Sequence, residues 1–253
     1  MFFRGRMAMH EAVPCTACWL RPRAYFRPLG EAEARFIQEM KSAQLTVAAR
    51  AKVIEAGEVG GSLYTLYDGW AIRYRMLGET RRRQILDVVL PGDFVGLEAH
   101  ILGLTEHSVQ ALTPASLCVL RGRRLSELFE QHPDWGLSLL RWIVEDQRRD
   151  DVWRSVLGRL DAAERMAYLL LEIFDRLEQR GMAAEQSCRF PLSGQHLADM
   201  LGLSRAHVSR VLADFAQRRW ARIESGTLLI EARAALARLA GYQGVAPGPR
   251  VLL

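Results

Sequence analysis

The 253-residue sequence predicts an α+β fold, in which a β-rich N-terminal half precedes one long helix and a largely helical C-terminal region. Between about Leu45 and Leu120, short apolar or alternating runs are separated by glycine-containing turns. This spacing is typical of consecutive strands that form a small β-roll. Within it, Asp68-Gly69 has the composition of a tight hairpin turn. After Pro133 the apolar residues adopt a three-four spacing, which indicates helices.

We expect the chain to divide into five segments. They are an N-terminal segment with a CxxC motif (1–30), the β-roll (31–130), the long helix (131–160), a C-terminal domain (161–241) and a tail (242–253). The tail is rich in glycine and proline, so we expect it to be flexible.

The composition narrows the class of protein. A formal net charge of +5 and a pI near 9.3 favour a polyanionic partner only weakly. No signal-peptide core or bilayer-spanning run is present, so we expect a cytoplasmic protein without membrane contact. Four cysteines are too few for a disulfide scaffold at this length, and Cys188 is most simply structural. We find no nucleophile-base-acid set, phosphate loop or metalloprotease helix, and therefore do not expect an enzyme.

The long helix carries a candidate contact surface for a partner helix. Leu137, Leu140 and Val144 keep a three-four spacing, but the polar stretch 147–151 interrupts it. This pattern suits a weak or conditional coiled-coil contact. A solvated helix face within one subunit is the alternative.

The strongest pattern in the chain lies between Leu192 and Phe215 and predicts two short helices joined by a tight turn. Ser193 and Ser204 are placed to cap the first and second helix, and Gly202 supplies the left-handed residue that the turn requires. The buried stripe of the second helix is expected to consist of Val208, Val211, Leu212 and Phe215. A hairpin that only packs in a core is the alternative.

The opposite face of the second helix has the residue types that contact DNA. At its start are Ser204, Arg205, His207, Ser209 and Arg210, where a recognition helix presents base-contacting side chains to the major groove. Arg218 and Arg219, with Arg222, follow as candidate phosphate contacts. Two short apolar runs then flank Ser225-Gly226 and predict a two-stranded wing, so the C-terminal domain is expected to be a winged helix-turn-helix.

The order of a β-roll, a long helix and a winged helix-turn-helix resembles the CRP/FNR family of bacterial transcription regulators. PGDFVGLEA (Pro91–Ala99) is similar to the family's sensor domain, which is cyclic-nucleotide-binding-like, and GLSRAHVSRVL (Gly202–Leu212) resembles its recognition helix. GETRRRQIL (Gly78–Leu86) is similar to the FixK-like relatives of FNR. The resemblance implies a homodimer on near-palindromic double-stranded DNA, with half-sites ~34 Å apart, and RNA polymerase as a further partner.

The resemblance also bears on the effector. Members that bind cyclic nucleotides carry a Glu and an Arg where this sequence has Leu97 and His107, although Ser108 is retained. This difference argues against cyclic AMP. A surface or hydrogen-bonded histidine is a simpler interpretation of His107 than an anion contact.

Three cysteines match positions that hold an iron-sulfur cluster in FNR. Cys15, Cys18 and Cys118 fall at such positions, but Ala24 or Phe26 stands where the remaining cysteine is usual. The cofactor is therefore unknown, with two possibilities. One is an iron-sulfur or other metal site completed by a non-cysteine group such as His10 or Glu11. The other is a degenerate site whose thiols serve redox sensing or nothing.

The resemblance implies two further roles. Asp150 falls where an acidic residue makes dimerisation conditional in FNR, and we group it with Leu140 and Val144 as dimerisation residues. Ala206 and His207 replace residues that usually read the operator, so its sequence is not predicted. We expect a regulator controlled by oxygen, redox state or a metal or iron-sulfur centre. The alternative responds to a small molecule other than cyclic AMP, or to no ligand, with vestigial cysteines.

Overall fold

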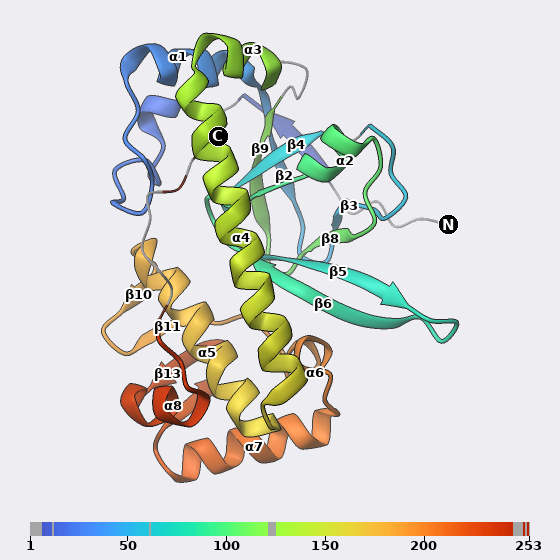
Figure 1. Ribbon diagram of the computed structural model, residues 1–253, viewed down its shortest axis with the longest axis vertical. Helices are drawn as coiled ribbons and strands as arrows, with labels where there is room; N and C mark the ends of the chain where they lie inside the picture. The colour runs from blue at the N-terminus through green and yellow to red at the C-terminus, as the bar shows by residue number, and fades with distance from the viewer. Residues whose placement is uncertain are drawn as a thin grey trace. The chain divides into compact units, whose positions relative to one another are not determined.

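A computed structural model describes residues 7–11, 13–60, 62–120, 125–244, 250 and 252 (Figure 1). The chain forms two compact units, one of Met1–Ile143 with Pro249–Leu253 and one of Val144–Gly248. The first is mainly β and the second mainly α, so the predicted α+β class is confirmed. No helix in these ranges has the length and apolar character needed to cross a bilayer.

The N-terminal unit contains a roll of two antiparallel sheets. One has the order β1 (Met7–His10), β2 (Lys41–Val47), β9 (Ala115–Leu120), β4 (Leu63–Asp68), β7 (Phe94–Val95). The other has the order β3 (Lys52–Ile54), β8 (Ser108–Ala111), β5 (Ala71–Leu77), β6 (Arg82–Val89). Leu66 and Leu117 from the first sheet and Val109 from the second belong to one buried cluster, which forms the core of the roll.

The prediction of a hairpin turn at Asp68-Gly69 is wrong. β4 and β5 flank this pair but lie in different sheets, so the pair is a crossover rather than a hairpin turn. Gly69 has φ +93°, and a Cβ there would lie 2.6 Å from the carbonyl oxygen of Pro114, so the close approach of a neighbouring loop requires glycine. The long hairpin is instead β5–β6, which turns between Gly78 and Arg81, both at positive φ (Figure 1).

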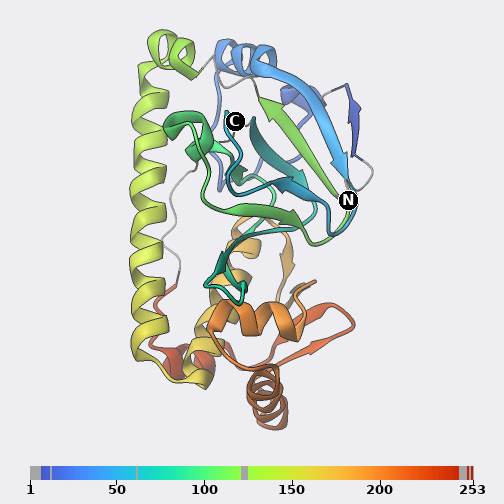
Figure 2. The same ribbon diagram turned by 90° about the vertical axis from the view of Figure 1, so that its right-hand side faces the viewer.

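Helices cover one end of the roll. They are the short 3-10 helix η1 (Cys15–Ala17), α1 (Glu31–Met40), α2 (Leu97–Leu102), α3 (Leu125–Gln131) and the start of α4 (Pro133–Arg159). Figure 2 shows α1 and α3 near the N-terminal end of α4. There the indole N–H of Trp135, which is buried, donates to Glu33 Oε1 at 2.7 Å. Arg27 Nη2 lies 3.0 Å from the same carboxylate oxygen, so Glu33 ties α1 to α4.

The 27-residue helix α4 corresponds to the long helix expected at 131–160. Its inner side buries Trp135 and Leu139. On another side Leu137, Leu140 and Val144 are 63%, 56% and 56% exposed. In the chain alone, the predicted contact stripe is therefore a row of apolar side chains in solvent.

In the C-terminal unit, the second part of α4 is followed by α5 (Ala162–Gln179). The Asp161 carboxylate accepts the amides of Ala163 and Glu164, and Glu164 accepts the amide of Asp161, which completes a capping box. The elements that follow are β10 (Ala183–Ala184), β11 (Ser187–Arg189), α6 (Gly194–Leu201), α7 (Arg205–Gln217), β12 (Ala221–Glu224), β13 (Thr227–Ile230) and α8 (Arg233–Ala240).

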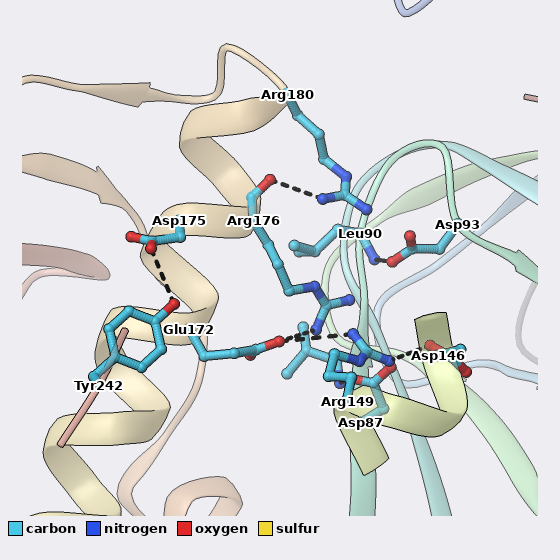
Figure 3. Close-up of polar contacts among 11 residues, drawn as sticks. Asp87, Leu90, Asp93, Asp146, Arg149, Glu172, Asp175, Arg176, Arg180 and Tyr242 are labelled. Carbon is cyan, nitrogen blue, oxygen red and sulfur yellow. Dashed lines mark hydrogen bonds and ion pairs between the residues drawn. The ribbon is translucent and has the colours of Figure 1, made fainter. Parts of the chain in front are cut away.

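A polar network joins α4 to α5 inside this unit (Figure 3). Glu172 Oε1 lies 3.5 Å from Arg176 Nη1 and 3.7 Å from Arg149 Nη1, and Arg149 Nη2 binds Asp146 at 2.7 Å. Arg149 belongs to the polar stretch 147–151, in which we expected charge to interrupt the outer face. This arginine instead contacts α5, so only part of the stretch remains on the outer face.

The tail expected to be flexible is bound at the positions that the structure describes. The Tyr242 hydroxyl donates to Asp175 Oδ2 at 2.9 Å (Figure 3). Arg250 bonds to residues 25 and 27 through its backbone, and Leu252 is 3% exposed. Leu252 is thus packed rather than exposed, whereas Gln243 and Gly244 are exposed and most of the tail lies outside the described residues.

Candidate DNA-binding surface and cysteine segment

The predicted helix hairpin is formed by α6 and α7. The Ser193 hydroxyl accepts the amide of His196 at 3.3 Å, and Nδ1 of His196 accepts the amide of Ser193 at 3.1 Å. Serine and histidine thus form the reciprocal cap that Glu or Gln usually completes. Gly202 ends α6 at φ +66°, and its amide donates to Ala198, so the turn has the left-handed residue that was expected.

The second helix begins at the predicted cap. The Ser204 hydroxyl accepts the amide of His207 at 3.2 Å. Val208, Val211 and Phe215 are buried beneath α7, whereas Leu212 is only partly buried. Burying three apolar side chains on this spacing fixes the rotation of α7 about its axis and directs its other side to solvent.

The solvent side carries the residues expected to contact bases. Arg205, Ser209 and Arg210 are exposed and His207 is half-buried. Among the described residues, neither Arg205 nor Arg210 forms an ion pair, so both guanidinium groups are open to an external acceptor. They belong to the first two turns of the helix, where amide groups and the helix dipole add positive potential.

The two arginines expected to contact phosphate differ. The Nε of Arg218 binds the Asp214 carboxylate at 2.9 Å, and its guanidinium lies 5.0 Å from the centre of the Trp220 ring. Arg219 is exposed at φ +55°, with no ion pair within the described part of the chain. Arg219 is therefore the better candidate for a phosphate contact, because Arg218 would have to give up its bond to Asp214.

The predicted wing is present as β12 and β13. Its turn residues, Ser225 and Gly226, both have positive φ, as a two-residue hairpin loop of the primed type requires. Sequence analysis did not predict that β11 would pair with β13, with Cys188 opposite Leu228. Cys188 is buried, and burial raises the pKa of its thiol to about 12, in agreement with a structural role.

The three N-terminal-unit cysteines are buried among different neighbours. Cys15 donates its amide to Gln38 and packs in the cluster that contains Trp135, whereas Cys18 packs with Tyr25 and Phe26. Cys118 lies in β9, between β2 and β4.

Lys41 is a neighbour of Cys118 that sequence analysis missed. Burial raises the pKa of the Cys118 thiol, and a hydrogen bond from Lys41 opposes that change. Cys15 and Cys18 are close enough to Cys118 to raise its pKa further. Cys118 is therefore influenced by Lys41 and by both other thiols, although Cys15 and Cys18 belong to different buried clusters.

The described side chains around Cys118 do not form a set of metal ligands. Within the described ranges, no three His, Cys, Asp or Glu side chains gather as metal ligands. Of the two extra donors considered, Glu11 is exposed, and the His10 side chain lies outside the described residues. The ammonium group of Lys41 is hydrogen-bonded to Cys118 and would repel a metal cation at the same sulfur.

Phe26 is one of the two positions at which the family resemblance implies a further cysteine, and it is part of the core. It is 2% exposed, and its ring lies where a side chain at position 92 would be: a Cβ added to Gly92 would come within 2.2 Å of the ring. The other candidate position, Ala24, is exposed.

Where the family resemblance implies the contacts to a cyclic nucleotide, the side chains of this protein bond to one another. His107 Nδ1 lies 2.7 Å from Glu98 Oε2, which also accepts the Thr105 hydroxyl at 3.2 Å. Burial and the nearby Arg73 lower the pKa of His107. The Ser108 hydroxyl accepts the amide of Ala56 at 3.0 Å. His107 is thus hydrogen-bonded within the protein.

Comparisons with known proteins agree with this geometry. A model of the Crp-like helix-turn-helix domain matches residues 164–239, and a model of the cyclic nucleotide-binding domain matches residues 44–132. The nitrogen fixation regulation protein FixK of Bradyrhizobium diazoefficiens is 30% identical over 202 residues, 78% of this chain and 81% of that protein. The transcriptional activator anr of Pseudomonas aeruginosa is 32% identical over 161 residues, 64% of this chain and 65% of that protein.

A more extended match and a solved structure complete the comparison. The fumarate and nitrate reduction regulatory protein of Escherichia coli K12 is 25% identical over 231 residues, 91% of this chain and 92% of that protein. The structure of FixK2 from Bradyrhizobium japonicum has a TM-score of 0.70 at 24% identity and covers 78% of this chain and 96% of that chain, a likeness of fold.

The fold and the exposed face of α7 define a DNA-binding transcription regulator. The chain belongs to the CRP/FNR family, in its FNR/FixK branch.

Proposed function

We propose that this protein is a homodimeric, sequence-specific transcription regulator whose DNA binding is controlled by oxygen or redox state through the cysteines of its N-terminal unit. The observation that carries the DNA-binding part is the open guanidinium pair of Arg205 and Arg210 on α7. Arginine can bind O6 and N7 of guanine bidentately in the major groove. Neither guanidinium has an ion pair among the described residues, so contacts to bases would not require an existing ion pair to be broken.

The dimer is supported by α4. Leu137, Leu140 and Val144 expose more than half of their surface, and a helix-helix contact would remove that apolar surface from water. Two copies related by a two-fold axis would present two α7 helices to half-sites about one DNA turn, ~34 Å, apart. The operator is accordingly near-palindromic, and RNA polymerase is the partner that a promoter-bound dimer would contact.

The surroundings of Cys118 support the proposal that oxygen or redox state is the signal. A thiol that is buried, bonded to Lys41 and close to two more cysteines changes its charge and contacts when it is oxidised. The relatives include proteins named as an anaerobic regulatory protein and as a fumarate and nitrate reduction regulatory protein, names that point to the same kind of signal. Because the described donors do not fit a metal site, the proposal assigns no role to an iron-sulfur cluster.

The test combines DNA binding with chemical analysis. Full-length protein purified without air is titrated against an operator selected from random duplexes, by fluorescence anisotropy at fixed salt. The titration is repeated after air or diamide and again after dithiothreitol. We expect affinity to change reversibly, and to stop responding when Cys118→Ser is introduced but not with Cys188→Ser, the matched buried control.

The same preparation settles the cofactor question. Iron and sulfide assays with a visible spectrum are made before exposure to air. A colourless, iron-free protein whose affinity responds to oxidant supports thiol control. Affinity that is the same in all three redox conditions would refute redox control while leaving the DNA-binding proposal intact.

A second candidate is an effector other than cyclic AMP. Its support is the Glu98–His107 pair, which places one acidic and one basic group where the family's β-roll holds a ligand. Redox-independent DNA binding that is restored by a small-molecule extract would favour it.

A further inference from the structure

The C-terminal end of the chain lies on the cysteine-bearing segment of the N-terminal unit. Arg250 forms a parallel bridge with Phe26: its amide donates to the Tyr25 carbonyl at 2.8 Å, and its carbonyl accepts the Arg27 amide at 2.8 Å. The Arg250 guanidinium lies 5.6 Å from the centre of the Tyr25 ring. Two backbone bonds and a cation–π contact thus attach Arg250 to Tyr25 and Arg27, the residues on either side of Phe26.

Leu252 completes the attachment. It is 3% exposed and belongs to the same buried cluster as Cys18, together with Leu20, Tyr25 and Phe26. Trp19 and Tyr67 pack against this cluster from its edge, and the Trp19 indole donates to the Tyr67 carbonyl at 3.2 Å. The chain's own end therefore contributes an apolar side chain to the cluster that buries Cys18.

The segment under this attachment leads to other parts of the unit. The Phe26 ring contacts the position of Gly92 in the turn before β7, and Arg27 pairs with Glu33 beside Trp135 at the start of α4. The cysteine segment is thus held by the β-roll and the start of α4 and also by Arg250 and Leu252, which belong to the same unit.

We propose that Arg250 and Leu252 form a strap that docks on Tyr25 and Arg27 and on the buried cluster around Cys18, and that this strap controls access to the Cys18 thiol. While the strap is docked, Cys18 is 7% exposed and protected from reagents. Release of the strap removes Leu252 from the cluster and opens the thiol. The inference concerns access to Cys18 and holds whether or not that thiol serves as the redox sensor.

The test measures cysteine alkylation in the full chain. Reduced, chelator-treated protein is exposed to iodoacetamide, and modification at each cysteine is followed by peptide mass spectrometry. We expect Leu252→Glu to speed alkylation of Cys18 at least about tenfold, because burial of the leucine side chain no longer opposes opening of the strap. Cys188, buried in the other unit, should keep its wild-type rate.

Two further variants keep the result interpretable. Leu102→Glu makes the same chemical change at a leucine that is 74% exposed on α2, and should leave Cys18 unchanged. Leu252→Ala removes the contact without inserting a charge, and should give a smaller rise at Cys18.

Hydrogen exchange gives an independent readout. The Arg27 amide, bonded to the Arg250 carbonyl, should lose protection in Leu252→Glu, whereas the Phe26 amide, bonded to the Arg23 carbonyl, should keep it. Equal Cys18 rates in wild type and Leu252→Glu would overturn the strap, as would an equal acceleration at Cys188.

Discussion

The hydroxyl of Ser204 accepts the amide hydrogen of His207 across 3.2 Å, and this bond caps the first turn of α7, the helix proposed to read DNA. The backbone that carries Arg205 is held in place by the same cap. The positions of the side chains proposed to contact DNA therefore depend on the Ser204 hydroxyl. Removing that hydroxyl should weaken the start of α7.

Replacing Ser204 should destabilise the C-terminal unit by a measurable amount. Ser204→Ala leaves the His207 amide without its acceptor, and we expect a loss of ~1 kcal/mol in the free energy of unfolding in urea. Ser204→Gly should lower the free energy of unfolding by only a few tenths of ~1 kcal/mol, because water reaches the freed amide. Equal stability of wild type and Ser204→Ala would show that the cap contributes nothing.

Arg210→Ala should weaken binding to the selected operator by about 1–3 kcal/mol, because it removes a base contact. Arg218→Ala is the matched control, since that guanidinium already binds Asp214, and it should cost less. Anisotropy titrations at one salt concentration decide between them. If Arg210→Ala binds the operator with unchanged affinity, α7 is misassigned as the reading helix.

The exposed stripe on α4 predicts a dimer that a single charge disrupts. Leu140→Glu places a carboxylate on the apolar row, and we expect the dimer dissociation constant in sedimentation equilibrium to rise at least about tenfold. Leu102→Glu, on an exposed leucine outside α4, should leave association unchanged. A dimer equally tight in both variants would place the interface elsewhere.

Asp150 should oppose association. It follows Ile143, which is 40% exposed, by seven residues and so lies on the same line of the helix, two turns further on. Bringing two such carboxylates together at a two-fold axis is unfavourable, so Asp150→Ala should increase the dimer fraction under conditions where wild type is partly monomeric. Sedimentation profiles identical to wild type would remove this role.

Glu33 predicts a pH dependence of stability. Burial raises the pKa of this carboxyl, but hydrogen bonds from the Gly30 amide and the Trp135 indole, together with Arg27, outweigh it and lower the pKa. A lowered pKa in the folded state means that the stabilisation is complete above the carboxyl's unfolded pKa, near ~4.3, and is lost as pH falls through the folded value. In urea unfolding, the difference between wild type and Glu33→Gln should shrink from pH 6 to pH 3. A constant difference would contradict this assignment.

The sequence predicted the DNA-binding hairpin well because its signals are local. Ser193, Gly202 and Ser204 act within one turn of the backbone, and the positions of caps and a left-handed residue do not depend on distant packing. His196 was missed as a capping partner because histidine rarely completes a capping box. The side-chain roles expected on α7 remain predictions, although the structure exposes Arg205 and Arg210 together.

Features that depend on distant contacts were predicted less well. Asp68-Gly69 has hairpin chemistry, but which sheet each flanking strand joins is decided by pairing with β9 on one side and β8 on the other. Nothing near Cys118 in the sequence indicates Lys41, which a neighbouring strand supplies. The docking of Leu252 likewise depends on aromatic residues more than 200 positions earlier in the chain.

The ring of Phe26 over Gly92 makes the side chains allowed at these two positions depend on each other. Any side chain at 92 collides with the ring, while a smaller residue at 26 leaves a cavity beneath the turn that precedes β7. A cysteine placed at 26 would leave part of this core unfilled, so packing by itself opposes a thiol at that position.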